Sequence, residues 1–162
     1  SKYARYNYDG YIQYVCRDNN GKYYIINEEL NTGDYKIFLD EYTIDQPEFI
    51  EEYEKSSDSE KAGYNINKFI QSINSKDYNY AYNCLAQSFK QNNFPTLESF
   101  EKYVKENFYD ENEIEHLNYM KESGYQVYQS LVKNANNDEE NVEKDFIVNL
   151  KENRDFEMSF EI

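Results

Sequence analysis

The spacing of apolar residues predicts three short amphipathic helices in the middle of the chain. The first covers residues 59–74; the second, residues 78–89, follows Asp77 as its N-cap, and the third, residues 97–108, follows Thr96. Each has one apolar face, as the first shows with Ala62, Ile66, Phe69, Ile70 and Ile73. Helices of this length are marginal alone in water, so they need a shared apolar surface.

Alternating strands in the last third of the chain supply that surface. Residues 156–162 alternate apolar with polar side chains, residues 146–150 form their partner strand, and residues 113–121 and 125–133 form a second hairpin. Residues 134–141, polar apart from Ala135, predict a mobile loop between the two hairpins. The pattern therefore predicts an α+β fold with a curved antiparallel sheet. One core is expected to unite Phe69, Leu85, Phe100, Val148 and Phe160.

The first part of the chain predicts a small three-stranded β-meander. Strands are expected at residues 11–16, 22–27 and 35–44, with turns at Asn19-Asn20-Gly21 and residues 31–34. So small a sheet cannot stand alone, so we expect it to pack on the main domain or on a second copy. A short helix over residues 45–55 and a Ser-rich linker then divide the chain into residues 1–58 and 59–162.

Charge and composition exclude several classes of function. A net charge of −15 repels phosphate backbones and anionic lipid, which argues against binding nucleic acid or a membrane surface. The 19 Tyr and 10 Phe residues make the chain too apolar to be disordered and predict an aromatic core. No apolar run is long enough to cross a membrane, and no signal peptide is visible. Because the chain starts at Ser1 and enters a strand almost at once, it has the look of an excised segment, from which an upstream signal or anchor could have been removed. We expect an extracytoplasmic location at the cell surface if an anchor was removed, and a cytoplasmic location otherwise.

The cysteines and acidic residues do not have the spacing of a metal site or of a redox-active thiol pair. Cys16 and Cys84 are far apart and fit no metal spacing; they can be paired or free, and Cys84 is expected to be a buried, inert thiol. Residues 18–21 resemble the start of an EF-hand loop, but with Gly21 as the required glycine the last ligand position is Asn27, so a hairpin turn is favoured. A second acidic group is expected to be a solvated face: Asp110, Glu111, Glu113 and Glu115. We expect no metal and no cofactor.

Catalytic residues are equally scarce. The motifs of serine hydrolases, zinc proteases, P-loop enzymes and dinucleotide-binding proteins are absent from the sequence. His116, the only histidine, follows Glu115 on a predicted strand, so the two side chains point to opposite faces. We expect His116 at the surface or on a pocket rim, and His116→Ala to leave function intact. The side chains that can line a cavity are Tyr82, His116, Tyr119 and Tyr128, although these tyrosines can equally be core residues whose hydroxyls reach water.

Two motifs in this helical order carry a resemblance to a known superfamily. Lys76-Asp77-Tyr78-x-x-Ala81-Tyr82 and Phe94-Pro95-Thr96-x-x-x-Phe100, followed by four strands, resemble the NTF2-like superfamily with its cystatin-like fold over residues 59–162. More narrowly, they and the lead-in at residues 40–49 resemble a group of such domains in clostridia and related Firmicutes that often follow an N-terminal membrane anchor.

The resemblance implies a cone, in which three helices pack on a curved sheet with a cavity at its wide end. Enzymatic members, similar to ketosteroid isomerases and polyketide cyclases, place an Asp base and a Tyr, His or second Asp in that cavity. No such dyad maps onto this chain, because the core-facing positions of its last two strands are apolar. The resemblance thus favours a noncatalytic binding or assembly domain outside the cell, with a protein partner or a second copy, and a small-molecule ligand as a further option. The alternative is a small-molecule enzyme that uses the tyrosines and His116.

Overall fold

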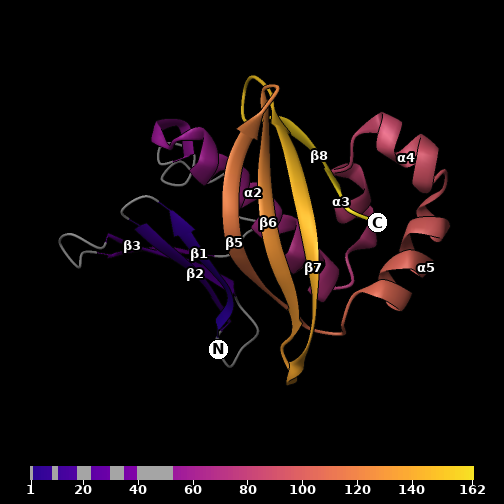
Figure 1. Cartoon of the computed structure of the whole chain (residues 1–162), viewed down its shortest axis with the longest axis horizontal. Coiled ribbons are helices and arrows are strands. Elements are labelled where there is room, and N and C mark those ends of the chain that lie inside the picture. The colour runs from indigo at the N-terminus through magenta and orange to yellow at the C-terminus, as the bar shows by residue number, and fades with distance from the viewer. Residues whose placement is uncertain (1, 9–10, 18–22, 30–34, 40–52) are drawn as a thin grey trace.

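The computed structural model describes residues 2–8, 11–17, 23–29, 35–39 and 53–162 of the chain, and it has an α+β architecture (Figure 1). The eight strands form one sheet in the order β4-β3-β2-β1-β5-β6-β7-β8. Every pair of neighbours is antiparallel except β1 and β5, which are parallel. The elements are β1 (Lys2–Tyr8), β2 (Tyr11–Arg17), β3 (Tyr23–Glu29), β4 (Tyr35–Leu39), α2 (Asp58–Asn74), α3 (Tyr78–Asn83), α4 (Gln87–Asn93), α5 (Leu97–Asn107), β5 (Asn112–Glu122), β6 (Tyr125–Asn134), β7 (Asn137–Leu150) and β8 (Phe156–Phe160).

The long strands β5, β6 and β7 curve along their length, and α2 crosses behind them (Figure 1). In Figure 1, α3, α4 and α5 lie beyond β8, at the opposite edge of the view from β5, whereas β1, β2 and β3 extend the sheet beyond β5. We call the side of β5–β8 that carries Ile114, Phe146 and Phe160 the inner face, because these side chains are buried in the core with α2.

The predicted helix starts are confirmed by their caps. Ser57 and Glu60 form a capping box at the start of α2, and the side chains of Asp77 and Thr96 cap α3 and α5. Each cap accepts a hydrogen bond from a backbone N–H of the first turn that would otherwise have no partner within the helix. Among the described residues, no helix is both long and apolar enough to cross a membrane.

The core is aromatic, as the composition predicts. The five residues expected to share it are all buried in one cluster: Phe69, Leu85, Phe100, Val148 and Phe160. Phe160 is its centre, with six aromatic rings at centroid distances of 5.1 to 6.3 Å. This packing fills the α5 side of the inner face.

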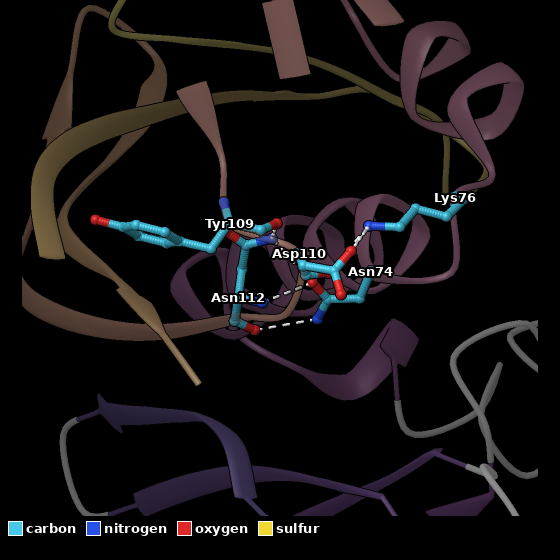
Figure 2. A network of polar contacts seen from close by, with 5 residues as sticks. All are labelled: Asn74, Lys76, Tyr109, Asp110 and Asn112. Atoms are coloured by element: carbon cyan, nitrogen blue, oxygen red, sulfur yellow. Dashed lines mark hydrogen bonds and ion pairs between the residues drawn. The ribbon is translucent and has the colours of Figure 1, made fainter. Parts of the chain in front are cut away.

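The C-terminus of α2 is joined to the start of β5 by a polar network (Figure 2). Asn74 Oδ1 accepts hydrogen bonds from the backbone N–H of Asn112 at 2.8 Å and from its side-chain amide at 2.9 Å. Asn112, which is fully buried, also bonds the backbone of Tyr109 in both directions, at 2.8 and 2.9 Å. Lys76 adds an ion pair to Asp110 at 2.9 Å. The network fixes the direction in which β5 leaves α5.

The single helix expected over residues 78–89 is wrong, because the structure contains two shorter helices, α3 and α4. The segment between them pairs with the edge of the sheet: Ala86 N donates to Met158 O and Met158 N donates to Cys84 O, both at 2.9 Å. Leu85 is buried at this point. Backbone bonds to β8 thus replace the helical bonds, and they also cover part of an edge strand.

The mobile loop expected over residues 134–141 is also wrong. β6 continues to Asn134 and β7 begins at Asn137, so the two strands form one long hairpin in which Lys133 pairs with Asn141. The hairpin extends past the core, where both of its faces meet solvent. Polar residues on both faces are what such a strand requires, so the absence of an apolar alternation does not indicate a loop.

The N-terminal part has four described strands rather than the three predicted, since β1 was not expected. β1 pairs with β5 at Ala4–Ile114 and Arg5–Glu115, so this part packs on the main domain, one of the two options that the sequence left open. The predicted turns at residues 19–21 and 31–34 lie outside the described residues. Of the helix expected over residues 45–55, only 53–55 are described, and they are helical.

Candidate functional site: a charged cleft

A cleft of about 500 Å³ opens at one end of the sheet. It lies between the N-terminus of α2 and the turns that join β5 to β6 and β7 to β8. We call it the charged cleft, and its lining residues are Tyr53, Glu54, Asp58, Lys61, Lys121, Gly124, Gln126, Leu150, Lys151, Glu152, Asn153 and Arg154. A second groove of about 400 Å³ lies between α4 and the strands β7 and β8, and Glu157 is the one charged residue among those that the structure describes in its lining.

Two tight turns shape the rim of the charged cleft. Ser123 and Gly124, at φ 52° and 84°, turn β5 into β6, and Asn153 and Arg154, at φ 56° and 65°, turn β7 towards β8. Paired positive φ values match the twist of a two-residue hairpin, although they are unfavourable for a residue such as Arg154. Arg154 is also held by an ion pair to Glu54 at 3.4 Å, which links this turn to the chain before α2.

The floor of the cleft is a buried amide. Gln126 is 2% exposed, and it lies directly across from Lys121 in the β5–β6 pairing, so both side chains leave the sheet on the inner face. The hydroxyl of Tyr119 donates to Gln126 Oε1 in a short hydrogen bond. Because its acceptor is occupied, the Gln126 side chain presents the N–H donors of its amide to the cleft.

α2 supplies the opposite wall. Asp58 and Lys61 are three residues apart and so share one face of the helix. Asp58 forms an ion pair with Lys121 at 3.3 Å, which bridges the helix and the sheet. The Lys61 ammonium lies over the ring of Tyr53, 5.6 Å from its centroid. Burial and the nearby Asp58 carboxylate both raise the pKa of Tyr119, so its hydroxyl stays protonated and remains a donor at neutral pH.

Three of the four residues expected to line a cavity come together beside this floor. The ring of Tyr128 lies 4.2 Å from that of His116 and 5.0 Å from that of Tyr119, measured between centroids. A β-bulge makes this row: His116 pairs with Ser130 but Asn118 pairs with Gln129, so Leu117 is an extra residue. The extra residue turns His116 and Tyr119 to the same face. Tyr128, the middle residue of the row, donates its hydroxyl to the carbonyl of Ser59 at 2.7 Å.

His116 is buried, with 5% exposure, so the expectation of a surface or pocket-rim histidine is wrong. Its Nδ1 lies 2.5 Å from the hydroxyl oxygen of Ser130, and burial lowers its pKa well below the ordinary value, which keeps the ring neutral at pH 7. Glu115 points to the opposite face, as predicted, and forms an ion pair with Lys133. The rings of Tyr128 and Tyr119 lie between His116 and the charged cleft.

Tyr82 is not part of this arrangement. Its hydroxyl donates to the carbonyl of Phe94 at 2.7 Å, and its ring packs 5.6 Å from that of Phe100. It is therefore a core residue between α3 and α5. Sequence reasoning missed Lys61, Lys121, Gln126 and Arg154, because nothing in their spacing shows that they share one cleft.

The remaining candidates have structural roles or fall outside the described residues. Cys84 is a free thiol and is buried, as predicted, and burial raises its pKa to about 12, which is the environment of an unreactive thiol. Two of the acidic residues, Asp110 and Glu115, pair with lysines, and in the described part of the chain no three ligand side chains converge on a metal position. Residues 18–21 and the side chain of Cys16 are not among those described.

A comparison with protein families, curated proteins and solved structures finds no match to this chain.

Proposed function

We propose that this chain is a noncatalytic binding domain of NTF2-like architecture and that the charged cleft is its ligand site. One observation carries the proposal: charged side chains from α2, from β5 and from the turn that joins β7 to β8 converge over a buried amide at the open end of the sheet. The other end of the inner face is filled with aromatic rings. Concave sites with a few convergent polar groups are typical of ligand binding.

The NTF2-like assignment is supported by the order of the elements. Capped helices precede four antiparallel strands, of which the longest curve around α2 (Figure 1). An extracytoplasmic location behind a membrane anchor follows from the resemblance to the Firmicutes group and belongs to the same proposal. The net charge of −15 argues against nucleic acid or anionic lipid as the partner. Association with another protein or with a second copy is compatible with a small ligand in the cleft.

The surroundings of the ionisable groups favour binding over catalysis. A general base must reach its substrate, and the His116 ring is buried behind two tyrosines. Asp58 does face the cleft, but its side chain is 53% exposed and ion-paired with Lys121. That is the environment of a surface salt bridge rather than of a desolvated catalytic acid or base.

A fragment screen followed by protein-observed NMR tests the proposal. Neutral fragments are expected to shift the backbone amide signals of Lys61, Lys121 and Gln126 in a saturable way. Binding confined to the groove between α4 and β8 would show that the charged cleft is not the site. The same samples are kept for a day and the fragment signals are followed. Conversion of any bound fragment by the protein, but not by the buffer, would refute the noncatalytic assignment.

A further inference from the structure

We propose that the ligand of the charged cleft is a small organic anion, whose carboxylate or phosphoryl oxygens are bound by Gln126, Lys121 and Lys61. This inference rests on the proposed function and specifies the chemistry of the ligand. Three observations support it: the hydrogen-bond donors of the floor, the position of the lysines and the local excess of cations.

The floor requires an acceptor. Gln126 is 98% buried, and its Oε1 already receives the hydroxyl of Tyr119. If the Tyr119 hydroxyl turned its proton away, Gln126 Oε1 would lose this hydrogen bond, so Tyr119 holds the side-chain amide of Gln126 in one orientation. The N–H donors of Gln126 remain for whatever occupies the cleft. A ligand oxygen with a negative charge forms a stronger bond there than a neutral one.

Two lysines flank these donors. Lys121 is the cross-strand neighbour of Gln126, and Lys61 lies on the face of α2 that carries Asp58. Asp58 is engaged with Lys121, and no carboxylate among the described residues lies within ion-pair distance of Lys61. Its ammonium rests on the ring of Tyr53 instead. An anion on the amide of Gln126 would therefore meet one lysine whose charge is not neutralised and the positive end of α2.

The described lining of the cleft also contains more Lys and Arg residues than the composition of this acidic chain would predict. An even distribution of 17 Lys and Arg over 162 residues would place one or two among the twelve lining residues that the structure describes, whereas four are present. The three lining carboxylates, Glu54, Asp58 and Glu152, are close to the number expected from 32 Asp and Glu. Three of these cations have carboxylate partners, since Lys151 pairs with Glu157 at 3.1 Å, Lys121 with Asp58 and Arg154 with Glu54. In a protein with a net charge of −15, the charge of Lys61 provides a place where an anion is not repelled.

A pair of matched ligands tests the inference. Benzoate and benzamide have the same ring and size but differ in charge, and each is titrated into the labelled full chain at constant ionic strength. We expect both to shift the cleft signals, with benzoate binding about tenfold more tightly because its bond to Gln126 and its attraction to Lys61 are charge-assisted. Phenyl phosphate, run alongside, shows whether a phosphoryl group is preferred to a carboxylate.

Two variants locate the effect. Lys61→Gln removes the unneutralised charge and should weaken benzoate about fivefold while benzamide is unchanged. Gln126→Glu replaces the donors by an acceptor and should reduce benzoate binding at least tenfold, with far-UV circular dichroism to verify folding. Lys102→Gln, on the exposed side of α5, carries the same change of net charge and should have no effect.

The outcomes separate the inference from the proposed function. If benzoate and benzamide bind the cleft equally, or if Lys61→Gln behaves like Lys102→Gln, the anion preference is refuted and the binding site stands. If neither ligand nor any neutral fragment binds the cleft, the proposed function is refuted together with the inference.

Discussion

Replacing Phe160 by alanine should remove the centre of the core. Its ring has six aromatic neighbours, from Phe89 at 5.1 Å to Phe146 at 6.3 Å, and the ammonium of Lys144 lies 5.3 Å from its centroid. A Phe→Ala change in a core costs about 3–5 kcal/mol through lost transfer energy and the cavity left behind. The ring contacts, each worth about 0.5–1.5 kcal/mol beyond buried area, place this site at the upper end of that range.

Urea unfolding followed by far-UV circular dichroism measures this cost. With a dependence on urea of about 2 kcal/mol per molar, a loss of about 4 kcal/mol lowers the midpoint by about 2 M while the slope is unchanged. Phe156→Ala, on the same strand, is the matched comparison, because Phe156 is half-buried and lies at the edge of the cluster. If Phe160→Ala costs less than about 1 kcal/mol, or no more than Phe156→Ala, the core is not centred on Phe160.

Three further predictions concern buried polar and thiol groups. Because burial lowers the pKa of His116, below about pH 6.5 the unfolded chain binds a proton that the folded chain does not bind. The free energy of unfolding should therefore decrease as the pH is lowered, by up to about 1.4 kcal/mol per pH unit. Urea unfolding at pH 7 and pH 5.5 should show a smaller decrease for His116→Asn than for the unmodified protein, and an equal decrease would contradict the assignment. Asn112→Ala removes three side-chain hydrogen bonds at the start of β5 and should cost about 2–4 kcal/mol by thermal unfolding, against under about 0.5 kcal/mol for the exposed Asn118→Ala. With a pKa near 12, Cys84 should resist iodoacetamide at pH 8 until the chain is unfolded in urea, and peptide mapping that finds it alkylated in the folded protein would show that it is accessible.

The parts of the fold that depend on neighbouring residues could be predicted from the sequence. Asp77 and Thr96 mark their helix starts through local hydrogen bonds, and the alternation through Phe156, Met158 and Phe160 identifies a strand with one buried side. The break at residues 84–86 could not be predicted in this way. Leu85 keeps the helical period of its neighbours, and only the distant Met158 makes an extended backbone favourable there.

The candidate site shows the same division. The residue types alone suggested that Tyr119, Tyr128 and His116 could line one cavity. Their actual proximity depends on the β-bulge at Leu117, and no residue in that stretch of the sequence predicts a bulge. A regular strand would have turned Tyr119 away from His116. The cations of the charged cleft come from α2, from β5 and from the turn between β7 and β8, so their proximity is a property of the folded chain alone.

The parallel pairing of β1 with β5 has a consequence for the order in which the protein is made. Ala4 pairs with Ile114, so after β1 more than a hundred further residues must leave the ribosome before β5 exists. Contacts so distant in sequence form slowly, and in the meantime the edge of β1 that does not face β2 exposes its backbone to other chains. We therefore expect the N-terminal strands to join the sheet late in folding. Nascent chains in which β5 has not yet been synthesised are expected to be the most prone to pair with one another when they are concentrated.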